Sequence, residues 1–159
     1  MKKGQLIGQI FIYILAIILI AFVLGYGYKA ISSFRQKAEQ ASFIKFRNEL
    51  QNAVKTITTD YGSIKIIELD VPSDYREVCF VKTPPDTGIP VALTIASYPN
   101  YPIIVDSTAS GIEKNVFLVK DIPKESFYAG KIAFDEDLVR NFYCAPVLNS
   151  KIKLRLEGK

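Results

Sequence analysis

A long uncharged run near the start of this 159-residue sequence limits what the chain can fold into. No charge lies between Lys3 and Lys29, and residues 10–24 are apolar without a break. As an α-helix, residues 6–28 would extend about 35 Å, more than the roughly 30 Å of hydrocarbon in a bilayer. One isolated segment can satisfy its backbone hydrogen bonds in lipid only as a helix. The run therefore predicts a membrane-spanning helix.

Two other structures could contain such a run. The core helix of a soluble protein needs apolar segments around it, and no other segment here is apolar enough on all sides to surround this one. A cleaved secretory signal ends at a small-x-small site, for which Gly25 and Gly27 offer only a weak pair. We therefore expect the apolar segment to remain on the mature protein.

The helical pattern continues beyond the apolar run. Between residues 30 and 60 the apolar residues recur at steps of three or four, slightly out of phase after the fourth. They are Ile31, Phe34, Ala38, Ala41, Phe43, Phe46, Leu50, Val54 and Ile57. No proline precedes Pro72, and Gly62 is a plausible C-terminal stop. The pattern predicts one helix over residues 6–60, apolar all round in its first half and amphipathic in its second.

After Gly62 the period changes from 3.6 to 2. In residues 151–157 the apolar Ile152, Leu154 and Leu156 alternate with charged residues, which is typical of a half-solvated antiparallel strand. Clusters of turn residues separate the other apolar runs. Further strands are expected over residues 63–69, 76–82, 91–97, 102–106, 116–120 and 131–134, and a short helix or a loop over 135–143.

These patterns predict an α+β fold. A long N-terminal helix, with a transmembrane half and an amphipathic half, would precede a compact antiparallel β-sheet head. The expected boundaries are 1–4 for a leader, 5–28 for the transmembrane helix, 29–61 for the amphipathic stem and 62–159 for the head. The head is long enough for a core if the stem covers one face of the sheet.

The net charge of +4 is unevenly distributed. Residues 1–60 hold eight Lys and Arg against three acids, whereas residues 61–159 hold twelve against thirteen. The basic excess therefore lies beside the predicted span, where it would meet lipid headgroups or set the membrane topology. A nearly neutral head does not indicate a face that follows a phosphate backbone, so no nucleic-acid partner is expected.

The only two cysteines, Cys79 and Cys144, both lie in the head. Two cysteines without a histidine make a poor metal site, and their separation excludes a CxxC redox pair. They could remain as two buried thiols, or form a disulfide that would stabilise the head by about 4 kcal/mol. We expect the disulfide because an exported domain lies in an oxidising compartment.

Catalysis is not expected from this composition. The sequence has no histidine, its acids are scattered over turns and alternating strand positions, and no phosphate-cradling glycine loop can be found. The densest acidic cluster, Asp135, Glu136 and Asp137, is typical of a solvated helix start or a loop. We therefore predict no catalytic residue, no metal site and no cofactor.

The aromatic residues suggest one possible contact site in the head. Tyr98 and Tyr101 stand beside Pro99 and Pro102, where a loop could present aromatic anchors to a partner. A proline turn with one tyrosine packed beneath it is the interpretation that we prefer.

The residues before the apolar run carry a resemblance to a known family. In a secretory signal the cleavage site follows the apolar run, whereas here Lys2, Lys3, Gly4 and Gln5 precede it. This order resembles the class III signal of type IV pilins, particularly the archaeal pilin-like proteins. The resemblance implies a basic leader of Lys2 and Lys3, a cut after Gly4 by a prepilin peptidase, and a mature chain that starts at Gln5.

The resemblance also implies how the apolar helix would be used. It would leave the bilayer and pack against copies of itself in a filament core. The residues that would take part are Gln9, Ile10, Ile14, Ile17, Ala21, Leu24, Gly25 and Gly27. Many family members carry Glu at the position of Gln9, and an archaeal motif has Ser at the position of Ile7, so the chain departs from the family at both. An assembly ATPase and a multi-pass membrane platform are further partners that the family implies.

The resemblance thus implies a structural subunit of an extracellular filament similar to a type IV pilus. Before assembly it would be a single-pass protein of the cell membrane, with a short cytoplasmic N-terminus and an extracellular head. The alternative is a membrane-anchored module that never polymerises and uses its head to bind a partner or sense the envelope. The fate of residues 1–4 distinguishes the two.

Overall fold

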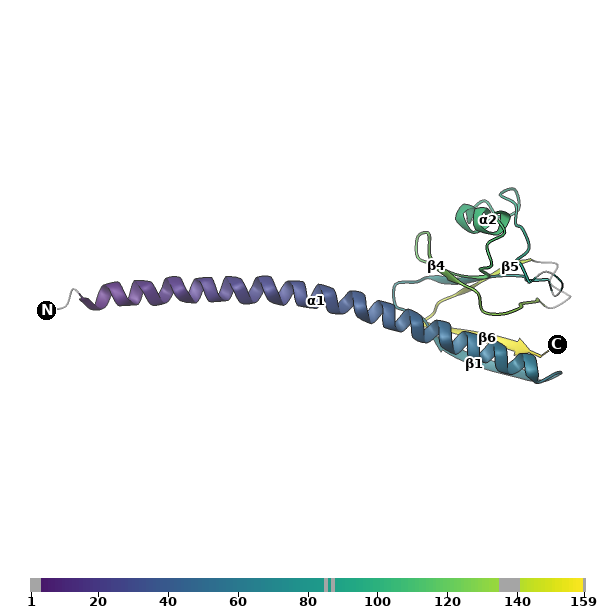
Figure 1. Cartoon of the computed structure of the whole chain (residues 1–159), viewed down its shortest axis with the longest axis horizontal. Coiled ribbons are helices and arrows are strands. Elements are labelled where there is room, and N and C mark those ends of the chain that lie inside the picture. The colour runs from purple at the N-terminus through teal and green to yellow at the C-terminus, as the bar shows by residue number, and fades with distance from the viewer. Residues whose placement is uncertain (1–3, 85, 87, 135–140, 159) are drawn as a thin grey trace. The chain divides into compact units, whose positions relative to one another are not determined.

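The computed structural model describes residues 4–84, 86, 88–134 and 141–158. The chain falls into two units, Met1–Ala41 and Ser42–Lys159, and the helix α1 (Gly4–Thr59) begins in the first and ends in the second. Beyond α1 the strands form two antiparallel sheets (Figure 1). The prediction of an α+β fold with a long N-terminal helix is therefore confirmed.

The first unit consists of α1 alone in the part that the structure describes. Gly25 and Gly27 do not interrupt the helix, although glycine is a weak helix former. No residue of the most apolar stretch of α1 is buried, although its large side chains are apolar on all sides of the helix.

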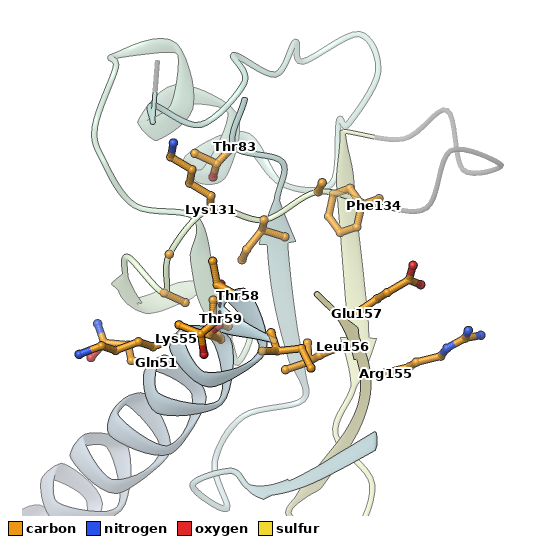
Figure 2. Close-up of a pocket in the computed structure, with 16 residues that line it drawn as sticks. Gln51, Lys55, Thr58, Thr59, Thr83, Lys131, Phe134, Arg155, Leu156 and Glu157 are labelled. Atoms are coloured by element: carbon orange, nitrogen blue, oxygen red, sulfur yellow. Dashed lines mark hydrogen bonds between the residues drawn. The ribbon is translucent and has the colours of Figure 1, made fainter. Parts of the chain in front are cut away.

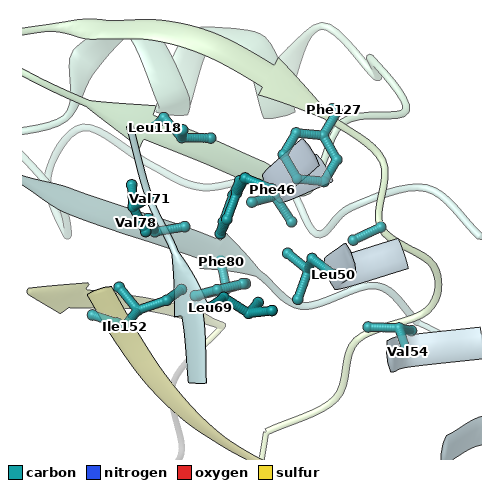
Figure 3. Packing of buried hydrophobic residues seen from close by; sticks show 13 residues of the cluster. Phe46, Leu50, Val54, Leu69, Val71, Val78, Phe80, Leu118, Phe127 and Ile152 are labelled. Carbon is teal, nitrogen blue, oxygen red and sulfur yellow. The ribbon is translucent and has the colours of Figure 1, made fainter. Parts of the chain in front are cut away.

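The last turns of α1 belong to the core of the C-terminal unit, residues 42–159. Phe46, Leu50, Val54 and Ile57 follow one another at steps of three or four, and all four are buried. Phe46 packs edge-on against Phe127, with ring centroids 6.1 Å apart. Figure 3 shows Phe46, Leu50 and Val54 facing the side chains of the strands. The amphipathic half of the helix thus covers a sheet face, as its periodicity predicts.

The strands form two sheets. In the first, β1 (Ile64–Asp70) pairs with β6 (Lys151–Glu157). In the second, the order is β4-β3-β2-β5. Its strands are β2 (Glu77–Val81), β3 (Val116–Val119), β4 (Pro123–Phe127) and β5 (Phe142–Pro146).

The four-stranded sheet has a hydrophobic cluster on each face. Along β2, Val78 and Phe80 join the cluster that contains Phe46, whereas Cys79 and Val81 join a second cluster with Ile104 of α2 (Pro102–Ala109). Alternate residues of a strand point to opposite faces, so a strand covered on both sides becomes apolar throughout. This explains the continuous apolar run of residues 78–81.

Three of the expected strands are wrong. Residues 102–106 lie in α2, because Pro102 at its first turn suits a helix start and Ile104, Val105 and Thr108 share a buried helical face. Residues 91–97 and 131–134 form no strand. Conversely, β4 was not predicted, and β5 includes Phe142 and Tyr143 from the segment expected to be a helix or a loop; residues 135–140 of that segment lie outside the described part of the chain.

Candidate functional site

The exposed apolar surface of α1 is the first candidate site. Ile10, Ile14, Ile17 and Leu24, which the resemblance implies for assembly, are all exposed by about half or more. Burying one side chain of this size is favourable by about 1.5–3 kcal/mol. Covering the many exposed apolar side chains of this helix would therefore be strongly favourable. The helix is long and apolar enough to cross a membrane, and lipid or protein could cover it.

Small residues interrupt this apolar surface. Ala21 and Gly25 are four residues apart and so lie on one side of the helix. A Cβ added at Gly25 or Gly27 would meet nothing within 4 Å, so neither glycine is required by a contact within the described chain. A small-x-x-x-small spacing allows a second helix to approach closely in a membrane. The pair therefore offers a contact surface for another helix.

An aromatic and basic border follows the apolar run. Phe22 stacks on Tyr26, with centroids 5.2 Å apart, and Tyr26 and Tyr28 are both exposed. Lys29 comes directly after them. Tyrosines and then a cation are typical of the depth at which a helix leaves the hydrocarbon for the headgroups.

The predicted disulfide is present in the C-terminal unit. Cys79 of β2 and Cys144 of β5 stand directly opposite each other in the sheet register, with Cα atoms 3.9 Å apart, and their sulfur atoms are bonded. The bond joins two strands, and its two cysteines are 65 positions apart in the chain. It therefore ties the middle of the sheet to its edge strand.

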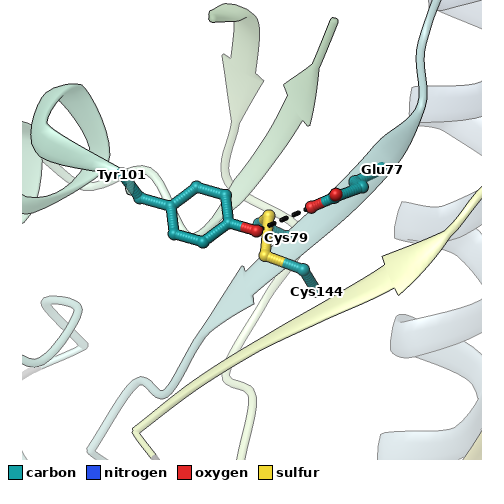
Figure 4. Close-up of a disulfide and its surroundings, with 4 residues drawn as sticks. All are labelled: Glu77, Cys79, Tyr101 and Cys144. Atoms are coloured by element: carbon teal, nitrogen blue, oxygen red, sulfur yellow. Dashed lines mark hydrogen bonds between the residues drawn. A yellow bond between two sulfur atoms is a disulfide. The ribbon is translucent and has the colours of Figure 1, made fainter. Parts of the chain in front are cut away.

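A tyrosine and a glutamate adjoin this disulfide. The Tyr101 hydroxyl donates a hydrogen bond of 2.7 Å to the Glu77 carboxylate, over the sulfur atoms (Figure 4). Burial, the hydrogen bond and the charge of Glu77 together raise the pKa of Tyr101 to about 12. Among the described residues, Glu77, Cys79 and Cys144 are the group whose metal-ligating atoms converge within 4.8 Å. Because the sulfurs are bonded to each other, this group offers no thiolate to a metal ion.

Tyr98 and Tyr101 have intramolecular contacts as well as partial exposure. Both rings pack edge-on against Phe142, with centroid distances of 4.9 and 5.1 Å. Both contact the second hydrophobic cluster. The preferred interpretation expected one packed tyrosine, whereas the structure packs two.

Two site residues escaped the sequence analysis. Glu77 was part of an expected strand, and nothing in the sequence links it to Tyr101. Asn115 is completely buried, and its side-chain amide donates to Thr83 Oγ1 at 3.0 Å and to the Gly130 carbonyl at 2.6 Å. Its Oδ1 accepts from the Ala129 N–H at 2.9 Å. A buried polar side chain satisfied in this way holds three loops together.

The residues expected to form and flank a leader lie only partly within the described part of the chain. Lys2 and Lys3 lie outside the described residues, and Gly4, Gln5 and Gln9 lie in the backbone of α1. Comparisons with protein-family models, curated proteins and solved structures find no match for this chain.

Proposed function

We propose that this protein is a structural subunit of an extracellular filament similar to a type IV pilus, held in the membrane before assembly by its apolar helix. The observation that carries the proposal is the contrast along α1. From Phe46 to Ile57 the helix is part of a folded core, whereas from Ile10 to Phe34 its large apolar side chains are exposed. Apolar side chains exposed along so much of a helix favour a covering of lipid or of other helices.

Lipid and other copies of the helix are the two coverings that the proposal combines. The Tyr26, Tyr28 and Lys29 border supports a membrane-inserted state, since aromatic and basic residues favour the interface. The close spacing of Ala21 and Gly25 supports a packed state, because small residues let helices approach. A subunit that moves from bilayer to filament core needs both properties.

The disulfide supports the placement of the C-terminal unit outside the cell. Structural disulfides persist in oxidising compartments and are rare in a reducing cytosol. In this arrangement residues 1–4 face the cytoplasm, where a prepilin peptidase would remove them. The assembly ATPase and the membrane platform are partners by family resemblance.

Intact-mass measurement of the protein from its host membrane tests the proposal. Loss of residues 1–4 and a mature chain that starts at Gln5 are expected, and Gly4→Leu should block the cut. A chain that retains residues 1–4, or one that starts near Tyr28, contradicts the proposal. Retention would favour the anchored module that does not polymerise.

A further inference from the structure

A cleft lies on one side of the C-terminal unit. Its volume is about 800 Å³, and it is lined by the end of α1, the end of β6, Thr83 and the segment 129–134. Figure 2 shows Thr58 and Thr59 on the helix and Leu156 beside them, with Lys131 and Phe134 above them in the view. The apolar part of the lining includes Val54, Ile57, Ile132, Phe134 and Leu156. A mainly apolar lining with a few polar groups is suited to ligand binding.

The end of β6 lines this cleft through three consecutive residues, Arg155, Leu156 and Glu157. Side chains of a strand alternate between faces, as Leu156 does with Arg155 and Glu157 in Figure 2. A cavity on one face of a strand would therefore be lined by every second residue. Because three consecutive residues line the cleft, we infer that it runs along the edge of the strand, where the backbone is accessible.

Hydrogen bonds identify which backbone groups are on that edge. The Gly158 N–H donates to the Ser63 carbonyl at 3.0 Å, and the Val71 N–H donates to the Ser150 carbonyl at 2.8 Å. The even-numbered residues of β6 thus bond to β1, and by alternation Arg155 and Glu157 direct their N–H and C=O groups to the opposite edge. Among the described residues, β1 is the one strand that pairs with β6.

Charge on the Arg155 face of β6 favours acidic side chains in the occupant. Lys153 and Arg155 are exposed on this face, and Glu157 follows them with one carboxylate. Within the described part of the chain, neither Lys153 nor Arg155 forms an ion pair. Acidic side chains placed near them would gain charge-assisted hydrogen bonds.

We propose that the cleft is a strand-addition site for an extended segment of a partner protein in which acidic and apolar residues alternate. The segment would pair its backbone with Arg155 and Glu157 on the open edge of β6. Its apolar residues would lie on the face of Leu156, and its acidic residues on the face of Arg155. Edge strands bind extended peptides in this way, with affinity from the backbone and specificity from alternate side chains. The site belongs to the C-terminal unit, so it does not depend on polymerisation.

The test uses the full chain in detergent micelles and a fluorescent, end-capped seven-residue peptide of alternating valine and aspartate. Fluorescence anisotropy should show saturable binding to the protein and none to empty micelles. A matched peptide with proline at its centre should bind at least tenfold more weakly, because proline cannot complete the ladder. Hydrogen exchange should show that the first peptide protects the amides of Arg155 and Glu157.

Variants connect the binding to this edge. Arg155→Glu should weaken binding of the valine–aspartate peptide at least tenfold and should strengthen binding of a valine–lysine peptide. Lys124→Glu on β4 should change the binding of neither peptide. Thermal unfolding of each variant shows whether it is folded. Equal binding of the proline peptide, protection elsewhere than β6, or no binding by the folded wild-type protein would overturn the proposal.

Discussion

The Tyr101 hydroxyl donates a hydrogen bond to the carboxylate of Glu77, beside the disulfide that links β2 and β5. Tyr101 directly precedes α2, and Glu77 begins β2, so this bond fastens the α2 layer to the sheet. Burial, assisted by the hydrogen bond and charge of Glu77, raises the pKa of Tyr101 from 10.0 to about 12. The folded state therefore favours the neutral phenol.

The stability of the C-terminal unit should consequently fall at high pH. Because the pKa of Tyr101 is raised in the folded state, Tyr101 contributes to the free energy of unfolding. This contribution is complete below pH 10 and is lost as the pH rises towards 12. Urea unfolding across this window should show a steeper loss for the wild type than for Tyr101→Phe, which has no proton to lose. Parallel losses in the two proteins would contradict this role of Tyr101.

Removal of the disulfide should destabilise the same unit. The bond closes a loop between residues 65 positions apart, for which chain entropy predicts a loss of about 4 kcal/mol, within a usual range of 2–5. The paired variant Cys79→Ala with Cys144→Ala should show this loss in urea unfolding. Addition of a reductant should lower the stability of the wild type but not of the variant. A variant as stable as the oxidised wild type would disprove a structural role.

The end of α1 should behave as part of the core. Leu50 is 1% exposed and lies in the main cluster, so Leu50→Ala should lower the free energy of unfolding by about 2–5 kcal/mol. Ile44 on the same helix is 54% exposed, and Ile44→Ala should change it by less than about 0.5 kcal/mol. Equal effects of the two substitutions would show that the helix does not pack as described.

The elements that could be predicted are those in which apolar residues recur at a regular spacing. The helical spacing of Phe46, Leu50, Val54 and Ile57 and the alternation of residues 151–157 are local signals, and the structure confirms both elements. Ile103, Ile104 and Val105 all have a high strand propensity, as in a true strand. They nevertheless lie in α2, where the buried residues have helical spacing. Propensity alone could not distinguish these outcomes, because packing on the sheet decides them.

Contacts between residues that are distant in the sequence could not be predicted without the structure. The segment Lys124, Glu125 and Ser126 is too polar to signal a strand, yet it lies in β4 at the sheet edge, where polar residues are tolerated. The disulfide was expected from the compartment, but its cross-strand position depends on the register of β2 and β5. The Glu77 bond to Tyr101 and the open edge of β6 depend likewise on tertiary arrangement.

The most direct test of the proposed function is electron microscopy of fibres sheared from the host cell surface, labelled with an antibody against the C-terminal unit. We expect labelled fibres from wild-type cells. Ala21→Arg should abolish them, because a charge cannot enter a core of apolar helices, while the variant stays in the membrane fraction, since arginine near the end of a span can reach the interface. Absence of labelled fibres from wild-type cells that express the protein, or their persistence with Ala21→Arg, would contradict the account.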